Sequence, residues 1–137
     1  MIKKSDLNSK VDFWKKVLGL DGWEIKTTII SSSEMYNLVK KLEGEADKNE
    51  LIYAVLVNCH PVEQIASIAF LKNADKHFGI QLNLDTLIIH ELIHVATQEK
   101  FDNLPETIGN SNKIKELEEY IADFFARKLY LVYKKEI

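Results

Sequence analysis

The sequence has little of what marks secreted, membrane-spanning or nucleic-acid-binding proteins. Its single cysteine, Cys59, cannot form an internal disulfide, and the polar start MIKKSDLNSK lacks the apolar core of a secretory signal. The longest wholly apolar runs, such as 52–57, fall far short of the roughly 20 residues that cross a bilayer. The 18 basic and 21 acidic residues are mixed along the chain, which leaves no basic stripe for nucleic acid. We therefore expect a cytoplasmic protein with no membrane or nucleic-acid partner.

The chain also lacks internal repeats, low-complexity tracts and any segment that resembles an interdomain linker. Its 137 residues are 46% hydrophobic, which is enough to bury a core without metals or disulfides as staples. We expect one domain over residues 1–137.

The spacing of apolar residues predicts a mixed α+β chain. Helices are predicted over 5–18, about 35–42, 85–101 and 113–133. Strands are predicted from Trp23 to Ile29 and, because it is continuously apolar, as a buried strand over 51–58. Residues 64–71 fit either a strand or a helix opened by Pro61, and we favour the strand because a hairpin needs only the intervening turn. The remaining segments are predicted as linker (73–77), a short extended piece (78–82) and a loop (103–112).

One segment carries a chemical motif, because residues 90–94 read His-Glu-Leu-Ile-His. On an α-helix, residues four apart lie on one face, so the imidazoles of His90 and His94 can reach a single metal ion. Glu91 is offset by about 100° from His90, close enough to reach a water on that ion without being a ligand. The motif therefore predicts a zinc site with Glu91 as general base.

The helix that carries this motif is apolar on nearly every side. Its apolar residues are Leu87, Ile88, Ile89, Leu92, Ile93, Val95 and Ala96. Such a pattern is typical of a central, buried helix, and Asp85 is a plausible N-cap for it. Two histidines and a glutamate buried there would be destabilising without partners, and a metal ion supplies one.

No histidine follows His94, so a third ligand has to be a downstream carboxylate on an element that can pack alongside. The closing helix offers Glu119 at the margin of an apolar arc, beside two small alanines that let another helix approach. Glu118 points nearer to the arc and is the second choice. Asp123, one turn after Glu119, is placed to accept a hydrogen bond from the free ring nitrogen of a ligating histidine. The arc comprises Leu117, Ile121, Phe124, Phe125, Leu129 and Val132, and the alanines are Ala122 and Ala126.

The motif at 90–94, followed by Glu-Tyr-Ile-Ala-Asp at 119–123, resembles the gluzincin division of zincin metallopeptidases, whose pattern is H-E-x-x-H and then E-x-x-x-D. The resemblance implies a zincin-like α+β domain, with a small twisted sheet packed on helices and the motif helix buried. It implies that Glu119 is the third zinc ligand, that Glu91 is the catalytic base and that Asp123 supports a histidine ligand. It also implies that a strand before the motif helix, loosely matched by 64–71, borders the cleft and pairs with extended peptide.

The specific motifs cover only about residues 85–129, and the short chain is similar to the minimal zincins of bacterial and phage proteins. A metzincin would need Gly and His where Thr97 and Lys100 stand, and the G-T-x-D segment of an aspzincin is absent. Many zincins add a Tyr or His donor for the oxyanion, and the candidates here are His77, Tyr120 and Tyr130.

The sequence leads to two functional hypotheses, one for an enzyme and one for a non-catalytic protein. In the first, it is a zinc metallopeptidase that cleaves a peptide or protein substrate, which the presence of Glu91 favours because a structural zinc site needs no base. In the second, it is a non-catalytic zinc-binding or regulatory module of the phage-regulator type. The simplest alternative, with no metal, is that His90 and His94 merely share a helix face and that Glu119 is a solvated carboxylate.

Overall fold

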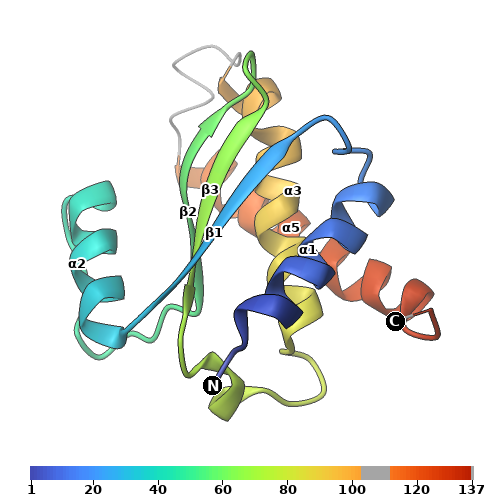
Figure 1. Cartoon of the computed structure of the whole chain (residues 1–137). Helices are drawn as coiled ribbons and strands as arrows, with labels where there is room; N and C mark the ends of the chain where they lie inside the picture. Colours follow the sequence, from blue (N-terminus) through green and yellow to red (C-terminus); the bar gives the residue numbers. More distant parts are fainter. Residues whose placement is uncertain (103–111, 137) are drawn as a thin grey trace.

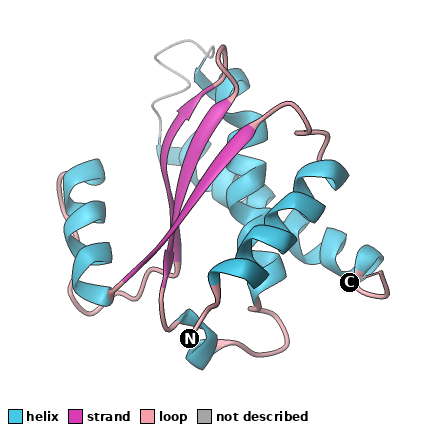
Figure 2. Ribbon diagram, viewed as in Figure 1, coloured by secondary structure: helices cyan, strands magenta, loops and turns pink. Residues whose placement is uncertain are grey.

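The computed structural model describes residues 1–102 and 112–136, and its α+β architecture agrees with the fold class predicted from the sequence. In this part of the chain, three strands form one sheet in the order β1-β3-β2, with α2 on one side of it and α1, α3 and α5 on the other (Figures 1 and 2). In chain order the elements are α1 (Lys4–Val17), β1 (Glu24–Ile30), α2 (Ser32–Glu43), β2 (Ala54–His60), β3 (Ile65–Leu71), the 3-10 helix η1 (Ala74–His77), α3 (Leu84–Asp102) and α5 (Asn112–Tyr133).

The centre of the sheet is β3, which runs parallel to β1 and antiparallel to β2. Ala66, Ala69 and Phe70 on this strand are fully buried. The strand interpretation of 64–71 is therefore confirmed over the helical one, and the strand forms a hairpin with β2 across the turn at 61–64.

β2 corrects the prediction of a fully buried strand over 51–58. The strand begins only at Ala54, lies at an edge of the sheet and keeps part of each residue exposed. An apolar run cannot by itself distinguish a buried strand from an edge strand beside a groove, because both need apolar side chains on both faces. A register shift between Leu56 and Asn58 also interrupts the regular pairing of β2 with β3.

α3 is buried along most of its length, as its sequence predicts, and Ile88, Ile89 and Leu92 have no exposed surface. Its start differs from the prediction, because the cap is Asn83 rather than Asp85. The Asn83 side chain accepts from the Thr86 backbone N–H at 2.9 Å, and the Thr86 hydroxyl accepts from the Asn83 N–H at 3.0 Å.

Asp85 instead anchors α3 to α1 from inside the first turn of α3. Its carboxylate accepts a hydrogen bond from Trp14 Nε1 at 2.9 Å and an ion-pair contact from Lys10 Nζ at 3.0 Å. Trp14 is fully buried, so its indole N–H requires an acceptor within the core. This contact helps to hold the metal-motif helix in place on α1.

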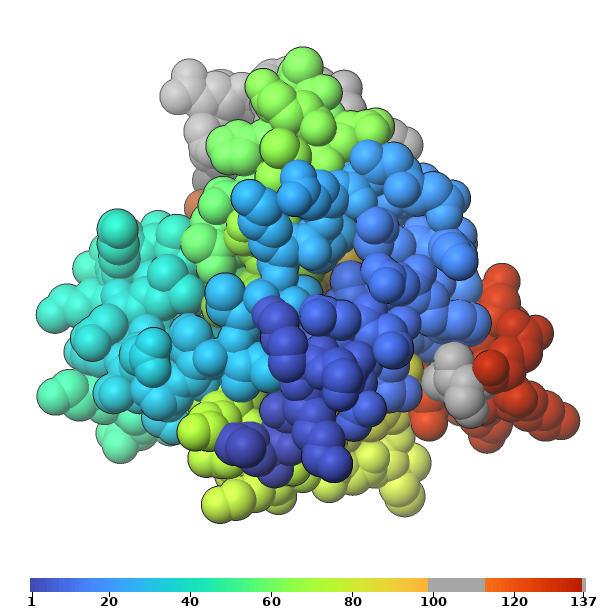
Figure 3. All heavy atoms as spheres, in the orientation of Figure 1, coloured from blue at the N-terminus to red at the C-terminus, as the bar shows by residue number. Residues whose placement is uncertain are grey.

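α5 packs on α3 through the small residues expected to let another helix approach, whereas much of the predicted apolar arc stays exposed. Ala122 and Ala126 are its buried residues, whereas Leu117, Phe125 and Val132 of the expected apolar arc are largely exposed. Two alanines one turn apart allow close approach of the helices, which outweighs the larger side chains in positioning α5. The last turns of the helix project from one side of the molecule (Figure 3).

The other segments are close to their predictions. α1 and α2 cover the two N-terminal helical patterns, and Ser31 with Glu34 forms a capping box for α2. The linker at 73–77 contains η1, and 78–82 has no regular strand. Of the predicted loop at 103–112, residues 103–111 lie outside the described residues and Asn112 begins α5. Among the helices in the described ranges, none has the length and hydropathy of a membrane span.

Candidate metal centre

His90 and His94 lie one turn apart on α3 and face the same point. Their Nε2 atoms are 3.1 Å apart and their ring centroids 4.9 Å apart. Their side chains are 17% and 12% exposed, so the pair lies at the edge of the core, where solvent can still reach it.

α5 brings Glu119 to this pair. One carboxylate oxygen, Oε1, lies 2.9 Å from His94 Nε2, and the other, Oε2, lies 3.2 Å from His90 Nε2. His90, His94 and Glu119 thus form a group that could hold a metal ion, with one ligand atom from each lying within 4.8 Å of the others.

The donor set and its spacing fit zinc. Two imidazole nitrogens and a carboxylate oxygen are common zinc ligands, with bonds of about 2.0–2.2 Å. In a tetrahedral site such bonds place neighbouring ligand atoms about 3.3 Å apart. The two histidine nitrogens are 3.1 Å apart, and each lies 2.9–3.2 Å from a different oxygen of the Glu119 carboxylate.

Two further carboxylates contact the outer nitrogens of the histidine rings. His90 Nδ1 lies 2.7 Å from Asp123 Oδ1, and His94 Nδ1 lies 3.0 Å from Glu118 Oε1. A proton on each Nδ1 donates to these carboxylates and leaves the Nε2 lone pairs directed at the shared point. Asp123 therefore lies where sequence reasoning expected it, while Glu118, the second choice for ligand, contacts the outer side of His94.

Glu91 lies beside the group without joining it. Its side chain is buried, with the residue 6% exposed, and burial raises the pKa of its carboxyl group above the usual range. The positively charged forms of His90 and His94 oppose that shift. Glu91 also lines the two pockets that border the metal group, so its carboxyl group can reach a molecule held there.

In the absence of metal, protons are held within this group. Burial lowers the pKa of His94, but hydrogen bonds to Glu119 and Glu118 outweigh it and raise this pKa to about 9. The pKa of His90 is also raised: burial lowers it, but the hydrogen bond to Glu119 and the negative charges of Glu91 and Glu119 together outweigh burial. The same two histidines hold the pKa of Glu119 well below its usual range. A metal ion would have to displace protons from the histidines.

The metal group lies in a cleft whose other wall is β2. Two open pockets, of about 380 and 590 Å³, share Ile52, Ala54, His90 and Glu91. The strand that borders the cleft is therefore β2 and not the segment 64–71 suggested by the resemblance. β3 is paired on both sides and cannot offer its backbone to a ligand.

None of the three candidate oxyanion donors lines either of these pockets. His77 packs against the ring of Tyr53, Tyr120 is exposed and stacks on Phe124, and Tyr130 belongs to a neighbouring pocket. Sequence reasoning instead missed Arg127, which lines the smaller pocket one turn beyond Asp123. Its position in E-x-x-x-D-x-x-x-R, with one residue per turn of a single helix, is the signal that could have found it.

Comparisons of the chain with protein-family models, with curated proteins and with solved structures find no match.

Proposed function

We propose that the protein is a zinc-dependent peptidase of the zincin type, with His90, His94 and Glu119 as the zinc ligands. The observation that carries this proposal is the convergence of two histidine nitrogens and one carboxylate at 2.9–3.2 Å, with Glu91 beside them in a cleft. A purely structural zinc site usually closes with four protein ligands and needs no neighbouring base.

The chemistry divides between the ion and the protein. When bound by three protein ligands with an open position, zinc would act as a Lewis acid for a carbonyl oxygen and would lower the pKa of its water to about 7. Glu91 takes the proton of the attacking water and delivers it to the leaving amine. Burial raises the pKa of Glu91 toward the working pH, which is the direction that suits a general base.

The position of β2 at the edge of the sheet supports the proposal that the substrate is a peptide. Along one side, its backbone N–H and C=O groups have no strand partner among the described residues, and this strand lines the cleft opposite His90. An extended peptide that pairs with β2 as an added strand would lie across the metal group, with its backbone held by hydrogen bonds. Asp123 and Glu118 keep the histidine rings oriented beneath it.

The test compares zinc content and peptide cleavage in four proteins. After identical metal-buffered dialysis, we expect about one zinc per chain, by elemental analysis, in the wild type and in Glu91→Gln, and loss of zinc in His94→Ala and Glu119→Gln. Cleavage of a peptide library, read by mass spectrometry, should fall by about 10²–10⁴-fold in Glu91→Gln.

The results for these four proteins distinguish a failure of the metal site from a failure of the peptidase activity. A folded, zinc-free wild type would contradict the metal site itself. A zinc-loaded wild type that cleaves nothing would contradict the peptidase and leave a non-catalytic zinc-binding module. Equal cleavage by the wild type and Glu91→Gln would assign the activity to a contaminant.

A further inference from the structure

The smaller pocket of the cleft lies on one defined side of the metal group. It extends from His90 toward the start of α3 at Leu87 and toward the start of β2 at Ala54, while the larger pocket extends toward Leu56 and Gln98. The cleft therefore has two ends along β2, and they differ in their side chains.

The direction of β2 indicates which end receives which part of a peptide. β2 runs from the smaller pocket toward the larger one, because Ala54 lines both and Leu56 only the larger. Antiparallel pairing is the more stable arrangement per residue. A peptide paired in this way with β2 runs in the opposite direction, so the part on the carboxyl side of the scissile bond enters the smaller pocket.

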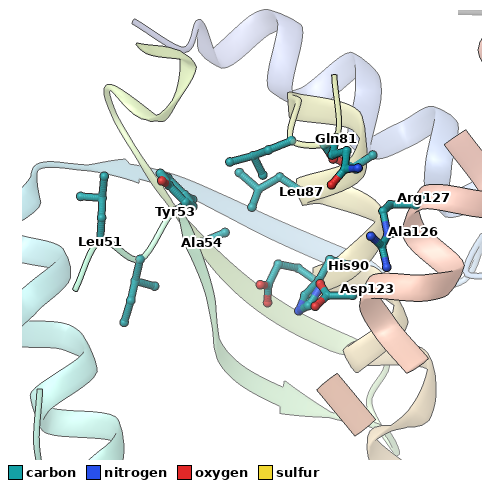
Figure 4. Close-up of a pocket in the computed structure, with 13 residues that line it drawn as sticks. Leu51, Tyr53, Ala54, Gln81, Leu87, His90, Asp123, Ala126 and Arg127 are labelled. Carbon is teal, nitrogen blue, oxygen red and sulfur yellow. The ribbon is translucent and has the colours of Figure 1, made fainter. Parts of the chain in front are cut away.

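Arg127 is the one arginine or lysine among the described residues that line this pocket. Within the described ranges, no carboxylate lies at ion-pair distance from it, although Asp123 is one turn away, since the Asp123 carboxylate contacts His90. Gln81 lines the same pocket, and its backbone carbonyl accepts a hydrogen bond from Thr86 Oγ1 at 3.4 Å, whereas its side-chain amide has no hydrogen bond within those ranges. Figure 4 shows Gln81 and Arg127 on one side of the pocket, across from Leu51 and Tyr53.

We propose that Arg127 binds a carboxylate of the substrate on the carboxyl side of the scissile bond. A guanidinium presents paired N–H donors that match a carboxylate, and the Gln81 amide adds a further donor nearby. This inference rests on the proposed peptidase function and names its substrate class: peptides that carry a free C-terminal carboxylate, or an acidic side chain, in the smaller pocket. Leu51, Leu87 and Ala126 provide an apolar wall for the intervening side chain.

The test measures binding rather than cleavage, in the zinc-loaded Glu91→Gln protein. The probes are three short peptides: acetyl-alanyl-leucyl-alanine as the free acid, the same peptide as its C-terminal amide, and the C-terminal amide in which aspartate replaces the last alanine. Affinities come from calorimetric titration. The free acid or the aspartyl peptide should bind about tenfold or more tightly than the plain amide, and the stronger of the two identifies the source of the carboxylate.

Two variants assign the preference to Arg127. Arg127→Gln in the same background should abolish it, whereas Lys128→Gln, which removes the same charge one residue away outside this pocket, should retain it. Equal binding of all three probes would overturn the proposal. A preference that survives Arg127→Gln and disappears when zinc is removed would place the carboxylate on the metal and would also overturn it. Because no cleavage is required, this result is independent of whether the wild type hydrolyses peptides.

Discussion

α3 and α5 supply all the residues of the metal group, but they reach it in opposite ways. α3 is apolar on nearly every side and buried, and its two histidines lie at the margin of the core. α5 turns its two alanines and three of its acidic residues, Glu118, Glu119 and Asp123, toward α3 and leaves large apolar side chains exposed. Large apolar side chains therefore predict which helix is buried, whereas small side chains decide how a second helix packs on it.

The largest expected effect is on the free energy of unfolding, from a substitution in the buried helix α3. Leu92→Ala on α3 should lower the free energy of unfolding by about 2–5 kcal/mol, because it removes a fully buried side chain and leaves a cavity. Phe125→Ala, a larger truncation on the exposed face of α5, should change it by less than about 0.5 kcal/mol. Urea denaturation measures both. A similar loss in both variants would show that the outer face of α5 is covered in solution.

The next prediction concerns the contact between the two helices. Ala122→Leu should lower the free energy of unfolding by about 1–3 kcal/mol, because the larger side chain overpacks the buried α3–α5 contact. It should also weaken zinc binding, since Glu119 is carried by the displaced helix. The control is Ala96→Leu, at an exposed alanine on α3, which should alter neither quantity appreciably. An unchanged free energy of unfolding and zinc affinity in Ala122→Leu would mean that the alanines do not determine the distance between α3 and α5.

A smaller effect is expected from the carboxylates that support the histidines. Glu118→Gln should weaken zinc binding by about 10–100-fold, because a neutral amide holds the outer nitrogen of His94 less firmly. Glu116→Gln removes the same charge from an exposed position on α5 and should leave the affinity unchanged. Competition with a chromophoric chelator measures both. Equal losses in the two variants would indicate a general charge effect.

The most gradual effect is on pH dependence. The pKa of His94 in the folded, metal-free protein is about 9, above its ordinary value of 6.5, so this group stabilises the metal-free fold below pH 6.5. That contribution is lost as the pH rises toward 9. Thermal unfolding of the metal-free protein should therefore show declining stability between pH 6.5 and 9.5, with a smaller decline in Glu119→Gln.

The same protons should oppose zinc binding. Zinc affinity should rise by up to about tenfold per pH unit for each proton displaced, and calorimetry in buffers of different ionisation enthalpy should detect the proton release. An affinity independent of pH between 6.5 and 8.5 would contradict the proton-loaded state of His94.

Some residues of the site could be predicted from the sequence more directly than others. His90, Glu91 and His94 lie within one helical turn of each other, so helix geometry alone places them together. Glu119 and Asp123 required an assumption about which face of α5 meets α3. The two small alanines beside them indicated that face, whereas the larger apolar residues of the arc did not. The edge position of β2 was missed, because the order of strands in a sheet is set by long-range pairing that an apolar run does not encode.

The sequence by itself determined the α+β class, the buried motif helix and the close pairing of two histidines, because these follow from local periodicity and from the i, i+4 geometry of a helix. Only the tertiary structure decided that Glu119 faces both Nε2 atoms, that Glu118 and Asp123 contact the outer nitrogens, and that β2 and Arg127 border the cleft. These arrangements depend on how α5 and β2 pack against α3, and that packing is the outcome of competition among all the side chains at once.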